Sequence, residues 1–152
     1  MLKPMNIGPE TGSARRSIGN FLTEELTPDW DGLGQLEWAK AMQACPQDPV
    51  YHAEGDVWTH TQMVVEALMA APDWQTLPAD TRRVLLVAAL LHDVGKPRTT
   101  EHLPGNRISS PGHARLGERT AREILWEEDF TLREQICAIV RLHGLTVWAL
   151  ER

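Results

Sequence analysis

The hydrophobic positions follow a helical period over most of the chain. After Asp56, apolar and small residues recur three or four positions apart, at Val57, Thr61, Val64, Leu68 and Ala71. This spacing predicts an amphipathic helix with Asp56 as its N-cap and Pro72 as its end. A second helix is predicted from about Pro78 to Val94. Its residues 84–91 are apolar on every face, which indicates that this helix lies at the centre of the fold.

Three further helices are predicted by the same kind of pattern. A short one covers Leu33–Ala44, and longer ones run from near Pro111 to Glu128 and from Thr131 to His143. The polar segment before Pro111 contains a turn at residues 104–106, which predicts a short β-hairpin near residues 99–109. The fold class is therefore all-α, a bundle of about five to seven helices.

Length and composition are typical of one globular domain. The chain has 152 residues, of which 42% are hydrophobic and 24% are charged, unlike a disordered or membrane protein. Residues 1–20 contain no apolar signal-peptide stretch and predict a flexible N-terminal segment before a single helical domain at residues 21–152. Two cysteines are too few for a disulfide scaffold, which favours a reducing, cytoplasmic setting.

Charge and hydropathy limit the partners. The formal net charge of −6 argues against an extended nucleic-acid surface, because binding to a phosphate backbone requires a basic surface. It leaves room for a small anionic ligand in a local basic pocket. The longest apolar run, residues 84–91, is too short to span a bilayer, so no membrane partner is expected. The sequence does not indicate an oligomeric state.

Four of the six histidines are predicted at corresponding ends of two helical hairpins. His60 lies in the first turn of one predicted helix and His92 in the last turn of the next, and His113 and His143 repeat this arrangement. The two pairs span 32 and 30 residues. Because helical arms of this size are about 18 Å long, an antiparallel hairpin brings both members of a pair to the same end. Adjacent hairpins would gather four imidazoles and the carboxylate of Asp93.

Each histidine has a simpler interpretation when it is taken singly. A histidine in an apolar stripe, such as His143, is commonly a hydrogen-bonded core residue, and the helix dipole favours histidine at a helix C-terminus. Taken together, four histidines at matching hairpin ends favour a metal site, and a purely structural helical bundle is the alternative. His52 and His102 fall in predicted loops, either in solvent or in support of the ligands.

The predicted site suggests a class of chemistry. Imidazoles with one carboxylate suit one or two divalent transition-metal ions (Mn, Fe, Ni, Co or Zn), and Mg is also compatible. Such an ion activates water and polarises a phosphoryl oxygen, so a phosphate ester is the expected substrate. Several nearby residues are expected to bind its phosphate group, although each could equally be an ordinary residue of a polar loop. They are Lys96, Arg98, Thr99, Thr100, Arg107 and Arg115.

Three motifs resemble the HD metal-dependent phosphohydrolase superfamily: DVWTHT at 56–61, LLHDVGKP at 90–97 and PGH at 111–113. The chain is most similar to the HD domains associated with tRNA CCA-adding nucleotidyltransferases and other RNA-processing enzymes, and the preceding HAEG at 52–55 strengthens that likeness. The resemblance covers about residues 51–143. It implies an HD-type helical bundle, a mono- or dinuclear metal centre, and hydrolysis of phosphomonoesters or phosphodiesters, either of nucleotides or of phosphorylated nucleic-acid ends.

The resemblance also implies roles for individual residues. His60, His92 and Asp93 match the metal ligands common to the superfamily, and Asp93 is the expected bridge if two ions bind. The extra ligands of dinuclear members match His113 and His143. Lys96 matches a lysine that lies near the substrate phosphate, so Asp93 and Lys96 are the expected catalytic residues.

One element of the superfamily pattern is not matched. The family usually has a further aspartate on a later helix, whereas Glu151 is the only acidic residue after His143. Two expectations follow. Either the domain is truncated and its distal ligand lies beyond Arg152, or the chain is a non-catalytic metal- and nucleotide-binding regulatory module of a larger RNA-processing system.

Overall fold

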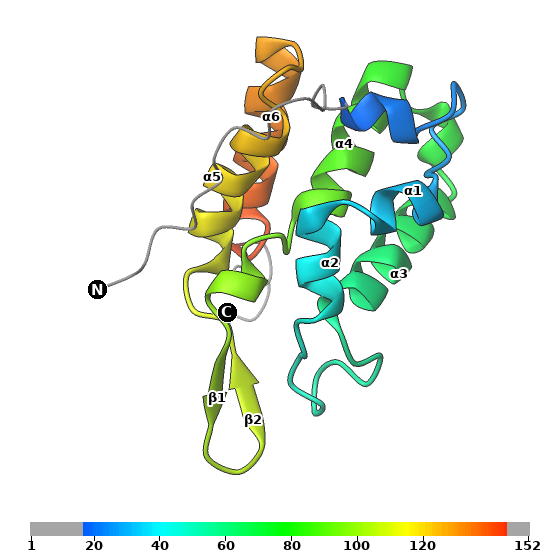
Figure 1. The fold of residues 1–152 in the computed structure, drawn as a ribbon. Coiled ribbons are helices and arrows are strands. Elements are labelled where there is room, and N and C mark those ends of the chain that lie inside the picture. The colour runs from blue at the N-terminus through cyan, green and yellow to red at the C-terminus, as the bar shows by residue number, and fades with distance from the viewer. Residues whose placement is uncertain (1–16, 146–152) are drawn as a thin grey trace.

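The computed structural model describes residues 17–145, which form six α-helices, three short 3₁₀-helices and one β-hairpin (Figure 1). The α-helices are α1 (Trp30–Gly34), α2 (Glu37–Gln43), α3 (Val57–Met69), α4 (Ala79–Leu91), α5 (His113–Ile124) and α6 (Phe130–Leu142). The remaining elements are η1 (Ile18–Phe21), η2 (Trp74–Thr76), η3 (Lys96–Arg98), β1 (Glu101–Leu103) and β2 (Arg107–Ser109). The predicted all-α class is confirmed.

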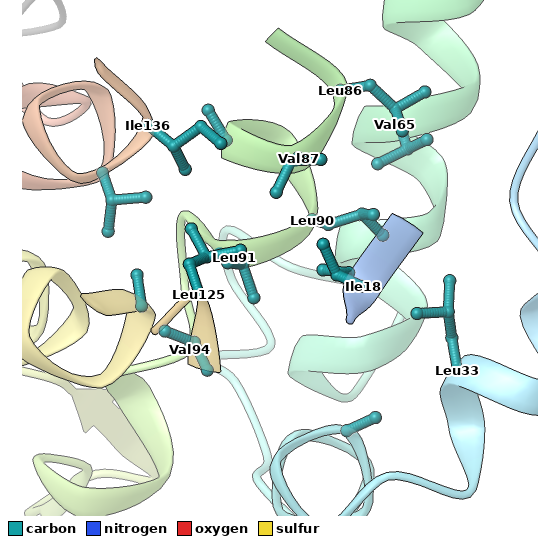
Figure 2. Packing of buried hydrophobic residues seen from close by; sticks show 14 of the residues in the cluster. Ile18, Leu33, Val65, Leu86, Val87, Leu90, Leu91, Val94, Leu125 and Ile136 are labelled. Atoms are coloured by element: carbon teal, nitrogen blue, oxygen red, sulfur yellow. The ribbon is translucent and has the colours of Figure 1, made fainter. Parts of the chain in front are cut away.

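Helix α4 lies at the centre of the bundle, as its apolar run predicts. It packs against α3 on one side and α6 on the other, and α5 packs along α6 (Figure 1). Its residues Leu86, Leu90 and Leu91 are fully buried, and Figure 2 shows them among side chains from both halves of the bundle, including Val65 of α3 and Ile136 of α6. Burial of each such side chain stabilises the fold by about 1.5–3 kcal/mol.

The ends of α3 and α4 follow from local chemistry. The carboxylate of Asp56 accepts a hydrogen bond from the backbone N–H of Thr59 at 2.9 Å, so Asp56 is the N-cap that the sequence predicts. Helix α4 ends at Leu91, three residues before the predicted end, and the chain then turns through residues 92–95. This turn places Asp93 beside the ends of the neighbouring helices.

The β-hairpin forms where the sequence predicts it. Strands β1 and β2 are antiparallel with Leu103 opposite Arg107, and Gly105 and Asn106 in the connecting turn have φ values of 77° and 58°. Glycine and asparagine are the residues that adopt such left-handed conformations at least cost. The hairpin projects from the same end of the bundle as residues 46–56, the α2–α3 loop (Figure 1).

Two predicted helices differ from the structure in their extent. The helix predicted at Leu33–Ala44 is two helices, α1 and α2, because Leu36 between them has an extended backbone with ψ of 143°. Helix α5 ends at Ile124 rather than Glu128. Ile18, which precedes the predicted domain start at residue 21, is only 3% exposed and belongs to the core.

Residues 1–16 and 146–152 lie outside the described part of the chain, and the prediction concerning Glu151 therefore does too. Among the helices of residues 17–145, none has the length and apolar character needed to cross a membrane.

Candidate metal centre

The ends of four helices bring four histidines together. His60 lies in the first turn of α3 and His113 is the first residue of α5, while His92 and His143 follow the last residues of α4 and α6. Successive ring centroids lie 5.6 Å apart for His60 and His92, 5.3 Å for His92 and His143, and 5.2 Å for His143 and His113. The convergence expected from the two hairpins is present in the structure.

Asp93 lies within this group and is only 2% exposed. Its Oδ2 lies 3.1 Å from Nε2 of His92. Its Oδ1 lies 3.3 Å from Nε2 of His113 and 3.6 Å from Nε2 of His143. The Nε2 atoms of three imidazoles therefore surround one buried carboxylate.

The other ring nitrogen of these three histidines is held by the backbone. Nδ1 of His92, His113 and His143 lies 2.7, 2.8 and 2.7 Å from the carbonyl oxygens of Ala89, Ser110 and Val140, respectively. A carbonyl oxygen can only accept, so each Nδ1 carries the hydrogen and each Nε2 of a neutral ring presents a lone pair. Hydrogen bonding of this kind orients histidines that bind metals.

This donor set fits a metal ion. Nε2 of His113 lies 3.2 Å from Nε2 of His143, and both face Asp93. Lone pairs and a carboxylate at these distances repel one another unless a proton or a cation lies among them. Asp93, His113 and His143 form one group whose ligand atoms all lie within 4.8 Å of one another, and His60, His92 and Asp93 form a second. Asp93 belongs to both groups, as a bridging ligand would.

The environment keeps Asp93 ionised. Burial alone would raise the pKa of Asp93, but its contacts with His143 and His92 and the charge of Lys96 outweigh burial and hold the pKa well below its ordinary value. Burial lowers the pKa of His60 and of His113, which favours the neutral ring that binds metals. For His143, burial is outweighed by Asp93, and the pKa is raised.

A cavity of about 310 Å³ opens beside this cluster, between the α2–α3 loop, strand β2 and the start of α5. Its volume is at the lower end of the range for small-molecule sites. Lys96 contributes a cation to its wall, and the Lys96 ammonium lies 2.8 Å from Oδ2 of Asp93 and 2.7 Å from Oε1 of Gln47. The lining residues are Gln47, Asp48, Tyr51, His52, Lys96, Ile108, Ser109, Ser110 and His113.

Of the residues expected to bind substrate phosphate, only Lys96 lines this cavity. Arg107 donates from Nε to Oδ2 of the buried Asp48 at 2.6 Å. The hydroxyls of Thr99 and Thr100 donate to backbone carbonyls within the η3 turn. Arg98 and Arg115 are exposed outside the cavity.

Glu54 is a further polar residue of the site, and no role for it is predicted from the sequence. Its Oε1 lies 2.6 Å from Nδ1 of His60 and 3.0 Å from Nδ1 of His52, and these residues form a third group of possible ligands. His52 is half-buried and lines the cavity, whereas His102 is exposed on β1. The HAEG motif before the first histidine was the available signal for Glu54.

Comparison with known proteins places this geometry in a family. Residues 57–148 match the model of the HD domain. The chain is 39% identical over 85 residues to the multifunctional CCA protein of Halorhodospira halophila. The aligned region covers 55% of this chain and 18% of that protein. It is 35% identical over 100 residues to the CC-adding tRNA nucleotidyltransferase of Thermus thermophilus, covering 64% of this chain and 21% of that protein. The chain thus spans about a fifth of each relative. No solved structure matches significantly.

Proposed function

The chain belongs to the HD domain family, and on this premise we propose that it is a metal-dependent phosphohydrolase, a phosphomonoesterase or phosphodiesterase. Its proposed substrate is a nucleotide or a phosphorylated nucleic-acid end. The observation that carries the proposal is the buried Asp93, which faces Nε2 of three histidines beside a cavity that contains Lys96. A metal centre next to a cationic pocket of this size suits hydrolysis of a phosphate ester.

The proposed ligands are His60, His92, Asp93, His113 and His143, with Asp93 as the bridge if two ions bind. A bound ion with an open position would supply a water of lowered pKa and polarise a phosphoryl oxygen. The preponderance of imidazole favours Mn, Fe, Ni, Co or Zn over Mg. The backbone carbonyls that hold the Nδ1 atoms keep three of the rings oriented for this task.

The cavity defines the proposed position of the substrate. The ammonium group of Lys96 would bind a non-bridging phosphate oxygen and stabilise the charge that develops during hydrolysis. The remainder of a nucleotide would extend towards Tyr51 and strand β2. Arg98 and Arg115, which lie outside the cavity, are proposed contacts only for a longer substrate such as a nucleic-acid end. The names of the two relatives make the end of a tRNA one such candidate.

Metal analysis tests this function most directly. Protein purified without a chelator is expected to contain a divalent transition metal, or to bind added Mn, Ni or Zn, and to hydrolyse members of a panel of phosphomonoesters and cyclic dinucleotides. We expect His92→Ala and Asp93→Asn to abolish both metal binding and turnover. The exposed His102→Ala provides a matched control that retains both. Protein that neither contains nor takes up metal would refute the proposed function.

A second function is a non-catalytic metal- and nucleotide-binding regulatory module of a larger RNA-processing system. The observation that favours it is coverage, because the chain spans only about a fifth of two relatives that are named for nucleotide addition. This module would be stabilised against heat by metal and nucleotide without consuming the nucleotide. Metal-dependent turnover that disappears in Asp93→Asn would reject it.

A further inference from the structure

His60 differs from the other histidines of the cluster in how its Nδ1 is held. In His92, His113 and His143, Nδ1 donates to a backbone carbonyl three residues earlier in the chain. In His60, Nδ1 instead lies 2.6 Å from Oε1 of Glu54. A side-chain carboxylate therefore occupies the position that a backbone carbonyl occupies at the other three rings.

The position of His60 at the start of α3 explains why its Nδ1 has a different acceptor. His60 lies in the first turn of α3, and the carbonyl three residues earlier belongs to Val57, the first residue of that helix. That carbonyl already accepts a hydrogen bond in the helical ladder, and the acceptor found at His60 comes from outside the helix. The chain turns back at Gly55, which has φ of 103°, and this turn places Glu54 against the His60 ring.

We propose that Glu54 is a positioning residue that orients His60 for metal binding. This inference rests on the proposed metal centre. Because Glu54 holds Nδ1–H, Nε2 is the nitrogen of His60 that remains for the group with His92 and Asp93. A negatively charged acceptor also makes the imidazole a better electron donor to a metal than a neutral carbonyl does.

His52 fixes Glu54 from the other side. Nδ1 of His52 lies 3.0 Å from the same Oε1 atom, and the rings of His52 and His60 meet edge to face with centroids 4.7 Å apart. The side chain of Glu54 is only 15% exposed between them. His52 also lines the cavity, so Glu54 joins the cavity wall to a proposed metal ligand. Replacing His52 should therefore weaken metal binding in the same direction as replacing Glu54, but by less.

Two measurements on Glu54→Ala and the isosteric Glu54→Gln test the role. In the metal-free wild type, nitrogen-15 NMR of the imidazoles should show His60 with its hydrogen on Nδ1, and Glu54→Ala should lose that preference. Calorimetry with Zn²⁺ should show affinity about 10- to 100-fold weaker in Glu54→Ala with unchanged stoichiometry, and a smaller loss in Glu54→Gln. The control is Glu66→Ala, which replaces an exposed glutamate of α3, the helix that carries His60. This variant is expected to match the wild type in both measurements.

Two results would overturn the inference. Unchanged His60 tautomer and Zn²⁺ affinity in Glu54→Ala would show that Glu54 does not orient the ring. Loss of one whole ion, with the remaining ion bound at full affinity, would show that Glu54 binds metal directly. Failure of the proposed function appears differently, as a wild type that binds no Zn²⁺. The NMR measurement needs neither metal nor turnover, so it still tests the Glu54–His60 contact in that case.

Discussion

The ammonium nitrogen of Lys96 lies 2.8 Å from Oδ2 of Asp93, so the proposed metal centre has a fixed positive charge at its border. Lys96 is three residues after Asp93, and its backbone N–H donates to the Asp93 carbonyl at 2.9 Å. Both side chains are largely shielded, with 13% and 3% exposed. A cation bound to Asp93 must therefore share the carboxylate with the ammonium group, or displace it towards the cavity.

Replacing Lys96 should have opposite effects on metal binding and on turnover. In Lys96→Met we expect about tenfold tighter binding of Mn²⁺, because a like charge close to the ion is removed. We expect kcat/KM for a phosphate ester to fall by about 100-fold, because the charge that stabilises the reacting phosphoryl group is lost. Calorimetry and steady-state kinetics measure the two effects.

The control for this prediction is Lys40→Met. Lys40 also pairs with a carboxylate three residues away, that of Glu37 at 3.3 Å, but this pair lies on the surface of α2. Lys40→Met should therefore change neither Mn²⁺ affinity nor kcat/KM. Weaker Mn²⁺ binding in Lys96→Met would contradict the prediction, because it would mean that Lys96 helps to assemble the ligands.

Gly95 permits the close approach that places His113 beside Asp93. A Cβ at position 95 would lie 2.6 Å from the backbone nitrogen of Gly117 and would collide with the carbonyl of His113. These are backbone atoms of α5, which cannot rotate away. Gly95→Ala should therefore lower the free energy of unfolding by about 3 kcal/mol, as measured by urea denaturation, and weaken metal binding. Gly144→Ala, at a position with open space around it, should have little effect. Equal stability of the two variants would refute this reasoning.

Helix periodicity and helix length were sufficient to predict the convergence of His60, His92, His113 and His143. Equal arms return the chain to the same end, and this relation depends only on distances along the sequence. The loops could not be predicted in this way. Asp48 accepts a hydrogen bond from Arg107, 59 positions away, and no sequence pattern indicates this partner. Such a pairing depends on how the α2–α3 loop and the hairpin pack, which no periodic pattern encodes.

The Asp48–Arg107 pair predicts a dependence of stability on acid pH. The hydrogen bond from Arg107 lowers the pKa of Asp48 below its ordinary value of 3.8, despite burial, and the backbone N–H groups of Ile108 and Val50 contribute. A group with a lowered folded-state pKa stabilises the fold above its unfolded pKa, and this stabilisation is lost as the pH falls through the folded value. Asp48→Asn should therefore melt below the wild type near neutral pH, and the difference should shrink below about pH 3.8.

Thermal melts of both proteins between pH 7 and pH 2 measure this difference. Asp31→Asn, which replaces an exposed aspartate of α1, serves as the control and should show no such pH-dependent difference. A gap between wild type and Asp48→Asn that widens as the pH falls would have the wrong sign and would exclude the ion pair as its cause.

Tyr51 lies at the wall of the cavity with most of its surface open to solvent. Tyr51 is 71% exposed, and the guanidinium carbon of Arg107 lies 5.4 Å from the centre of the Tyr51 ring. An exposed aromatic ring that lines a cavity beside Lys96 is a suitable platform for a nucleobase whose phosphate is held at the metal centre.

This arrangement predicts that Tyr51 contributes to the binding of the base and not of the phosphate. Stacking of a base on an aromatic ring is worth about 1–3 kcal/mol, so Tyr51→Ala should weaken binding of adenosine monophosphate by about tenfold or more. Binding of inorganic phosphate should not change, and Tyr51→Phe should keep the wild-type affinity for both ligands. Val50→Ala, the equally exposed neighbour, is the matched control. If Tyr51→Ala weakens binding of the nucleotide and of inorganic phosphate equally, Tyr51 shapes the cavity as a whole and the base lies elsewhere.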